Sequence, residues 1–192
     1  MPHIALPPGK PGMIALAAYR PDVYSYLGAL ADLLLHQEHP NSTLSLGERE
    51  LIATHISFLN SCNYCHTAHG NIAAAHLHSS AVVDDVKAQD LEDSEGLSPK
   101  MKELLRIAGL VQKGGKEVSA EAVERAKREG ACEMDVHDTV LIAAMFCMFN
   151  RYVDGLGTEM PEDMEGFKRR GEAIAERGYT MPVPLSDGNS GK

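Results

Sequence analysis

Residues 50–69 read ELIATHISFLNSCNYCHTAH, and this stretch contains two helical patterns separated by Asn60-Ser61. In the first, apolar residues recur at the spacing of an amphipathic helix, and Ser45-Leu-Gly-Glu48 before it fits a capping box. The second runs from Cys62 to about Leu77 and is rich in Ala and His. No segment alternates apolar and polar residues for as long as a strand requires. We therefore predict a pair of helices here, within an all-α fold that has no significant β-sheet.

The sequence on both sides of this pair continues the helical pattern. Ser98-Pro99 supplies an N-cap and a first-turn proline, and Asp22 and Pro161 are placed to start two further helices. The most apolar segment, Asp135 to Tyr152, is expected at the centre of the fold, whereas residues 88–95 are acidic and predict a loop. The expected helices cover about residues 13–19, 22–36, 45–60, 62–77, 99–112, 119–130, 135–152 and 161–178.

The length of the chain indicates how it is divided. With 192 residues and about 150 residues per domain, we expect a single domain over residues 1–180. Residues 181–192 contain Pro, Gly, Ser, Asp and Asn, a composition that predicts a mobile C-terminal tail.

The charge and the hydropathy of the chain exclude several classes of partner. There are 18 Lys and Arg residues against 27 Asp and Glu residues, a net charge of −9. General binding to nucleic acid or to an anionic membrane requires a basic surface instead. The longest apolar run, Val140–Phe149, is about half of the ~20 residues that span a bilayer. The N-terminus has no signal-peptide pattern. We therefore expect a cytoplasmic protein that binds neither nucleic acid nor a membrane.

Cys62, Cys65 and His69 follow one another at helical spacing, so they fall on one stripe of the second helix. The free N–H groups at a helix start stabilise a thiolate, and His69 is placed to exchange a proton with Cys65. Glu50 lies twelve residues before Cys62. If the two helices form a hairpin, its carboxylate can reach His69 and orient the imidazole. We expect catalysis by these four side chains, with no cofactor and no metal.

The spacing E-x11-C-x2-C-x3-H resembles the signature of the alkylhydroperoxidase D (AhpD)-like branch of the carboxymuconolactone decarboxylase family. The segment Phe149–Thr158 is similar to the N-R-x-x-D-x-x-G segment of the peroxidase-related members of that family. The resemblance implies an AhpD-like helical fold, a thiol-dependent peroxidase activity and homo-oligomers, often trimers or hexamers. By family role, Cys65 matches the cysteine that becomes a sulfenic acid. Cys62 matches the more exposed partner, which donates a proton and closes the disulfide, and His69 and Glu50 match the proton relay.

The function predicted on these grounds is an antioxidant (alkyl)hydroperoxide reductase. Its partners would be a hydroperoxide substrate, a dithiol protein reductant and further copies of the same chain. A second hypothesis is a dithiol redox adaptor that uses the same cysteines to reduce a peroxiredoxin. A third is a helical binding module stabilised by zinc, with Cys62, Cys65 and His69 as three ligands. The fourth ligand would then come from His55, His66, Cys132 or His137.

Several other residues in the sequence have open or structural interpretations. His55 could line the pocket next to Glu50, while His137 is expected at a helix start and Cys132 as a loop thiol without function. The best-studied AhpD enzymes have a His immediately before the second cysteine, where this chain has Tyr64. A phenol at that position predicts a changed surface for the reductant, with less effect on the peroxide step. Asn150, Arg151 and Asp154 fit either a structural network or a subunit contact.

Overall fold

The hairpin of two antiparallel helices expected around Asn60-Ser61 is present in the structure, a computed structural model that describes residues 1–87 and 91–179. The first helix, α3 (Leu46–Leu59), starts at a complete capping box between Ser45 and Glu48. Ser61 then adopts a left-handed conformation with φ 58°, which reverses the chain before the second helix, α4 (Asn63–Leu77). The two helices fold back on each other, so residues near 50 face residues near 69.

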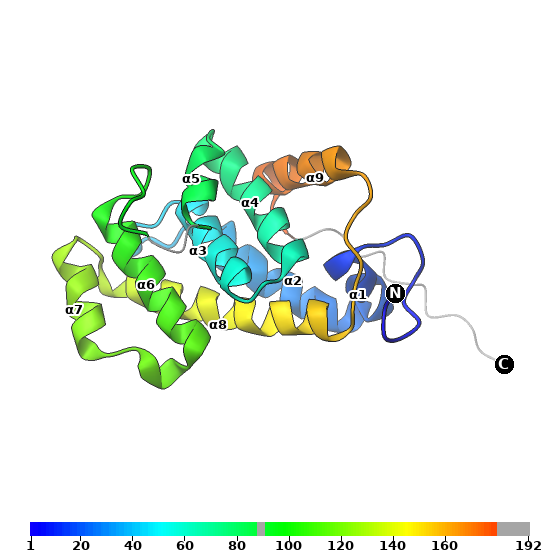
Figure 1. Ribbon diagram of the computed structural model, residues 1–192, viewed down its shortest axis with the longest axis horizontal. Helices are drawn as coiled ribbons and strands as arrows, with labels where there is room; N and C mark the ends of the chain where they lie inside the picture. Colours follow the sequence, from blue (N-terminus) through cyan, green and yellow to red (C-terminus); the bar gives the residue numbers. More distant parts are fainter. Residues whose placement is uncertain (88–90, 180–192) are drawn as a thin grey trace.

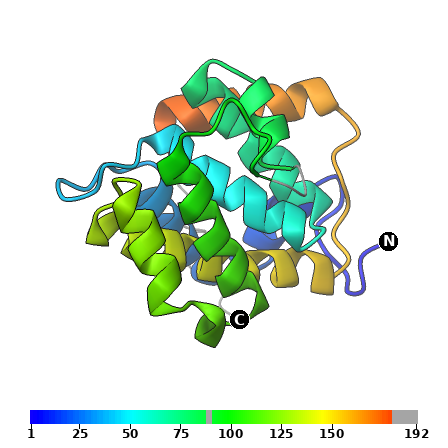
Figure 2. The same ribbon diagram turned by 60° about the vertical axis from the view of Figure 1, so that its left-hand side comes forward.

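The remaining helices pack around this hairpin, and the described residues contain no strand. Figure 1 shows α8 running along one side of the molecule, with α6 and α7 at one end and α1 at the other. Figure 2, after a 60° turn, shows α3 crossing the middle of the molecule. The other elements are α1 (Gly12–Tyr19), α2 (Pro21–Leu35), α5 (Ala81–Asp85), α6 (Pro99–Lys113), the 3₁₀ turn η1 (Gly115–Glu117), α7 (Ala120–Arg128), α8 (Glu133–Gly155) and α9 (Met164–Arg177). The predicted all-α fold is confirmed.

The main core lies where α3, α6 and α8 meet, because each helix buries its apolar stripe there. Fully buried residues of this core include Ile52, Ile56, Leu104, Leu105, Ile142 and Phe146. A charged pair is buried with them: the guanidinium of Arg49 on α3 lies 2.8 Å from the carboxylate of Asp138 on α8. The other side of α4 packs against α9, and Gly171 allows the close approach, since a Cβ there would lie 2.8 Å from the Cβ of Asn71.

Three helix boundaries differ from the sequence prediction. Pro21, not Asp22, begins α2, and the Asp22 carboxylate instead accepts two hydrogen bonds from Arg20 at 2.8 and 2.7 Å. The last helix starts at Met164 with Asp163 as its N-cap rather than at Pro161. The short helix α5 was not predicted, because five residues are too few to show helical periodicity. The Asp163 side chain caps the start of α9, whereas α2 starts at a proline without a side-chain cap, and no periodicity argument resolves either start.

Two of the sequence predictions concern parts of the chain that are only partly described or not described. Residues 181–192, predicted as a mobile tail, lie outside the described residues, and so do residues 88–90 of the predicted loop. Within the described ranges, no helix has both the length and the apolar character needed to cross a bilayer.

Candidate active site

Glu50 and His69 form the centre of the candidate site. Glu50 on α3 is completely buried, and its Oε2 lies 2.8 Å from Nδ1 of His69 on α4. The edge of the His69 ring meets Phe146, with 4.5 Å between ring centroids. Because Glu50 occupies Nδ1, Nε2 is the ring nitrogen left for a reacting group. The hairpin therefore brings together the two residues that the spacing had suggested.

Tyr179 joins this pair from the end of the described chain. Its hydroxyl donates a hydrogen bond to Oε1 of Glu50 and lies 3.2 Å from Nδ1 of His69. The Tyr179 ring stacks on the His69 ring, with an interplanar angle of 18°. Burial and the adjacent Glu50 carboxylate raise the pKa of Tyr179 well above its usual value. The phenol therefore stays neutral and acts as a permanent hydrogen-bond donor to the carboxylate.

The position of Tyr179 depends on how α9 ends. Gly178 follows the helix with φ 81°, a left-handed conformation that favours glycine. The Tyr179 N–H then donates to Oδ1 of Asp32 on α2 at 2.8 Å. Tyr179 was not among the site residues expected from the sequence. A glycine that ends a helix and is followed by a large apolar ring is the local signal, because that ring commonly packs back onto the fold.

Cys62 and Cys65 lie at the start of α4, and both are free thiols. Cys62 is the N-cap residue of α4, and Cys65 follows within the first turn. Their exposed fractions are 0% and 4%. Cys62 is therefore not the more exposed of the two in this chain, contrary to the expectation from the family resemblance.

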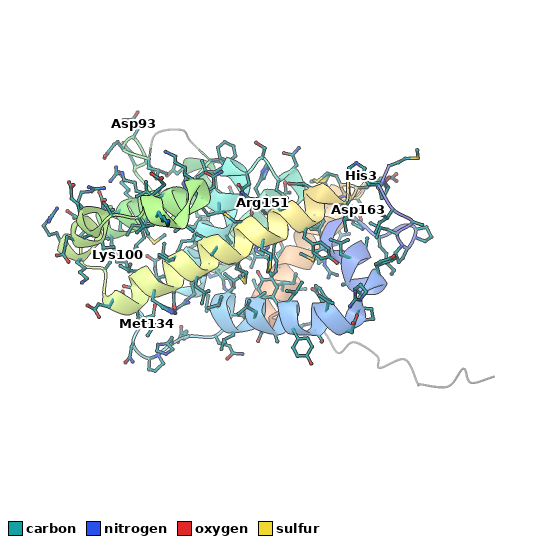
Figure 3. All side chains as sticks on the ribbon, turned by 90° about the horizontal axis from the view of Figure 1, so that it is seen from below. His3, Asp93, Lys100, Met134, Arg151 and Asp163 are labelled. Carbon is teal, nitrogen blue, oxygen red and sulfur yellow. The ribbon has the colours of Figure 1, made fainter. Side chains whose placement is uncertain are left out.

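The N-terminal segment and the end of α8 cover the cysteine pair. The His3 N–H donates to the Leu156 carbonyl at 2.9 Å, and the Gly12 N–H donates to the Glu159 carbonyl at 3.0 Å. Figure 3 labels His3 at this end of the molecule. Between these two contacts, Leu6 packs against the apolar cluster that contains Cys62 and Cys65. This cover explains why neither sulfur is exposed at the surface.

The two thiols differ in their surroundings. The hydrogen bond that its thiol makes to Cys65, together with burial, raises the pKa of Cys62 well above the usual value. A thiol that donates to a neighbouring sulfur is most stable when that neighbour is the thiolate. The geometry therefore makes Cys62 the sulfur that keeps its proton.

A cavity of about 80 Å³ opens beside Cys65. At ~10–15 Å³ for each water molecule, it has room for roughly half a dozen waters or a small organic molecule. Cys65, His69 and Tyr179 line it together, but Cys62 does not. The remaining lining residues are mostly apolar, namely Met13, Ile14, Leu27, Gly28, Ala31, Ala68, Ile72, Phe146, Phe149, Phe167, Gly171 and Ile174, together with Tyr24, Tyr64 and Arg170.

Tyr64 is part of the cavity wall and not of the molecular surface. Its exposed fraction is 8%, its ring lies 5.2 Å from that of Phe167, and Gly12 touches its other side, where any side chain would collide with the ring. Burial raises the pKa of Tyr64 above its usual value. The expectation that Tyr64 changes a surface offered to a reductant is therefore wrong, because the neighbouring α1 and α9 cover the ring.

The other histidines and cysteines singled out from the sequence lie elsewhere. His55 does not line the cavity; it is buried and its Nδ1 lies 2.7 Å from the Val86 carbonyl. Cys132 is the N-cap of α8, not a loop thiol, and its Sγ accepts from the Asp135 N–H at 3.4 Å. His137 lies in the first turns of α8, as expected, 3.0 Å from Asp138. Nowhere in residues 1–87 and 91–179 do three His, Cys, Asp or Glu side chains form a group that could hold a metal ion.

Asn150 belongs to a structural network, which decides one of the alternatives left open by the sequence. Its amide donates to Ser57 Oγ at 3.0 Å and accepts from Asn60 at 2.8 Å. Gln112 on α6 extends the network to Asn60 at 3.0 Å. The network ties α8 and α6 to the turn just before Cys62, and so fixes the start of α4. Arg151 instead donates to the Cys147 carbonyl at 2.7 Å on the exposed side of α8.

Comparison with known proteins agrees with this arrangement. The sequence profile of the carboxymuconolactone decarboxylase family matches residues 21–86, which include α2, α3 and α4. Among curated proteins, no sequence matches this chain. One similar solved structure is an AhpD core, an uncharacterised peroxidase-related protein from Ralstonia eutropha JMP134. It is 29% identical, with a TM-score of 0.73, over 84% of this chain and 81% of that one.

Two further structures share the fold. An uncharacterised peroxidase-related protein from Silicibacter sp. TM1040 is 22% identical, with a TM-score of 0.71, over 81% of this chain and 79% of that one. A protein of unknown function from Agrobacterium tumefaciens, described as a candidate antioxidant defence protein AhpD, is 17% identical. Its TM-score is 0.66, over 79% of this chain and 99% of that one. The fold is therefore AhpD-like.

Proposed function

We propose that this chain, whose residues 21–86 match the carboxymuconolactone decarboxylase family and whose fold is AhpD-like, is a thiol-dependent hydroperoxide reductase with Cys62 and Cys65 as its redox pair. One observation carries the proposal: His69, held at Nδ1 by the buried Glu50, lines one small cavity together with Cys65. A carboxylate that holds one imidazole nitrogen leaves the other free to exchange a proton with a nearby thiol. A cavity lined mainly by apolar side chains suits an organic hydroperoxide.

The first step is oxidation of Cys65. His69 accepts the thiol proton of Cys65, and the resulting thiolate attacks the terminal oxygen of the hydroperoxide. The O–O bond breaks, Cys65 becomes a sulfenic acid, and the departing alkoxide takes the proton of Cys62 and leaves as an alcohol. The raised pKa of Cys62 supports this order, because the proton is still on that sulfur when the alkoxide forms.

The second step closes the disulfide. The Cys62 thiolate attacks the Cys65 sulfur, the hydroxide leaves, and the proton held by His69 converts it to water. The net change is two thiols and one hydroperoxide into one disulfide, one alcohol and one water. A dithiol protein reductant then restores both thiols by thiol–disulfide exchange and is itself oxidised to a disulfide.

The cavity beside Cys65 favours direct reaction with a peroxide over the redox-adaptor hypothesis. Both functions need another protein to reach the cysteine pair in one step of the cycle, so the burial of Cys62 and Cys65, 0% and 4% exposed, does not distinguish them. The cavity, in contrast, gives a small peroxide contact with Cys65. Direct peroxidase turnover therefore accounts for the cavity, and relay to another protein does not.

The proposal is tested by steady-state peroxide consumption with Glu50→Gln and His69→Ala. Loss of a proton-transfer group typically lowers the rate by ~10²–10⁴-fold, and we expect losses in this range with the helical circular dichroism unchanged. His66→Ala is the matched control, since His66 is on the same helix but does not line the cavity. Wild-type rates in both relay variants would refute the proposal.

A further inference from the structure

Arg170 on α9 lines the same cavity as Cys65 and His69 and is half-buried there. Other arginines of this helix have acidic neighbours: Arg169 lies 3.6 Å from Asp163, and Arg177 lies 3.4 Å from Glu176. Arg170 makes no hydrogen bond and no ion pair within the described part of the chain. Its guanidinium nitrogens are not buried away from solvent, so the charge can pair with an anion that enters the cavity.

Among the described residues that line the cavity, none is an Asp or a Glu that could balance this charge. The polar neighbours are the half-buried Tyr24 and the buried Tyr64, and burial raises the pKa of both phenols, so they remain neutral. The chain as a whole has 27 acidic residues against 18 basic ones. The missing counter-charge is therefore a local property of this cavity and does not reflect a shortage of carboxylates.

We propose that Arg170 binds a carboxylate on the substrate, so that the preferred substrates are small hydroperoxides with a carboxylate group on an apolar body. This inference rests on the proposed peroxidase function of the same site. A guanidinium is suited to this role because its planar N–H groups match the two oxygens of a carboxylate. Arg170 takes no part in the electron or proton transfers; it selects and orients the molecule whose peroxide group meets Cys65.

The other walls of the cavity are consistent with such a ligand. Leu27 and Ala31 on α2 and Ile72 on α4 offer an apolar surface for the carbon chain. Room for roughly half a dozen waters corresponds to a short chain and not to a long acyl tail. The ligand would thus have its two polar ends at Arg170 and Cys65 and its apolar middle against these side chains.

The test measures the second-order rate of Cys65 oxidation by a three-carbon hydroperoxy acid and by its methyl ester. Wild type should react faster with the acid by about ten- to hundredfold, the range of a charge-assisted hydrogen-bonded pair. Arg170→Gln should bring the ratio of the two rates close to one. Arg169→Gln is the matched control, because it removes the same charge one residue away without touching the cavity, and its ratio should equal that of wild type.

Two results would overturn the inference: equal rates with acid and ester in wild type, or an unchanged preference in Arg170→Gln. Hydrogen peroxide, measured alongside, shows whether Cys65 reacts at all and so tests the proposed function separately. Calorimetric binding of the three-carbon hydroxy acid and its methyl ester to wild type and to Arg170→Gln requires no oxidation of Cys65. If wild type binds the acid but not the ester, and Arg170→Gln binds neither, the carboxylate site is supported even without peroxidase activity. If wild type and Arg170→Gln bind the acid equally well, the carboxylate site is refuted.

Discussion

The hydroxyl of Tyr179 donates a hydrogen bond to the carboxylate of Glu50, although the two residues are 129 positions apart in the chain. The same carboxylate holds Nδ1 of His69 through its other oxygen at 2.8 Å. Tyr179 therefore disperses the negative charge that faces the imidazole. It is a positioning residue in our proposal, since it acts through Glu50 and His69 and not on the peroxide.

We expect Tyr179→Phe to slow Cys65 oxidation by about ten- to hundredfold, the range of a hydrogen bond to a charged group. Burial and Glu50 raise the pKa of Tyr179 well above its usual value, so its phenol stays neutral and the loss should be the same at every pH. Stopped-flow oxidation between pH 5 and 9 measures the loss at each pH. Tyr24→Phe is the control, because Tyr24 lines the same cavity and its hydroxyl makes no hydrogen bond to a described residue. A Tyr179→Phe rate equal to that of wild type at every pH would remove Tyr179 from the relay.

Cys62 and Cys65 should be distinguishable by trapping. In Cys62→Ser, a sulfenic acid should accumulate on Cys65 after one equivalent of peroxide, because no second thiol can condense with it. In Cys65→Ser, no sulfenic acid should form, since the remaining thiol is buried and does not line the cavity. Mass spectrometry after dimedone labelling detects the sulfenic acid in each variant. A sulfenic acid in Cys65→Ser but not in Cys62→Ser would exchange the roles of the two cysteines.

Asp135 predicts how stability responds to acid. Burial alone would raise the pKa of its carboxyl, but hydrogen bonds from Thr43, Cys132 and Ser42 outweigh burial and lower the pKa to about 2. An unfolded Asp titrates near ~3.9. The stabilisation is therefore complete above about pH 4 and is lost as the pH falls toward 2.

Asp135→Asn should accordingly unfold at a lower urea concentration than wild type at pH 7. The difference between the two urea midpoints should stay constant down to about pH 4 and then become smaller. Urea titrations at pH 7, 5 and 3 measure it. Asp93→Asn, at an exposed position, should match wild type at each pH. A difference between the urea midpoints that increased in acid would contradict the predicted loss of stabilisation at low pH.

We also predict a homo-oligomer, because apolar side chains remain uncovered on α8. Leu141 and Met148 are seven residues apart on one face and are 37% and 45% exposed. A second copy of the chain is a natural cover for such a stripe. Light scattering of wild type at micromolar concentration should give a mass well above 20.8 kDa. Met148→Glu should lower that mass, whereas Met164→Glu, at a 47% exposed position on α9, should not; a monomeric wild type would rule out the oligomer.

The helices could be predicted from the sequence because their signals are local. The capping box at Ser45 and Glu48 and the Ser98-Pro99 start depend on residues within one turn, and both are present in the structure. The contact between Glu50 and His69 could also be predicted from the sequence, because a hairpin of two helices with a known turn has a single register. These features follow from spacing and helix geometry alone.

Burial, long-range partners and the charge of the cavity were decided only by the tertiary structure. The N-terminal segment covers Cys62, and α1 and α9 enclose Tyr64, so neither side chain has the exposure that its place in the motif had suggested. Tyr179 reaches Glu50, and Arg170 shares a cavity with Cys65, only because α9 packs back across α4. A single sequence specifies its helices through contacts three or four residues apart. Which faces then meet depends on packing between segments more than a hundred residues apart, and no local pattern encodes that choice.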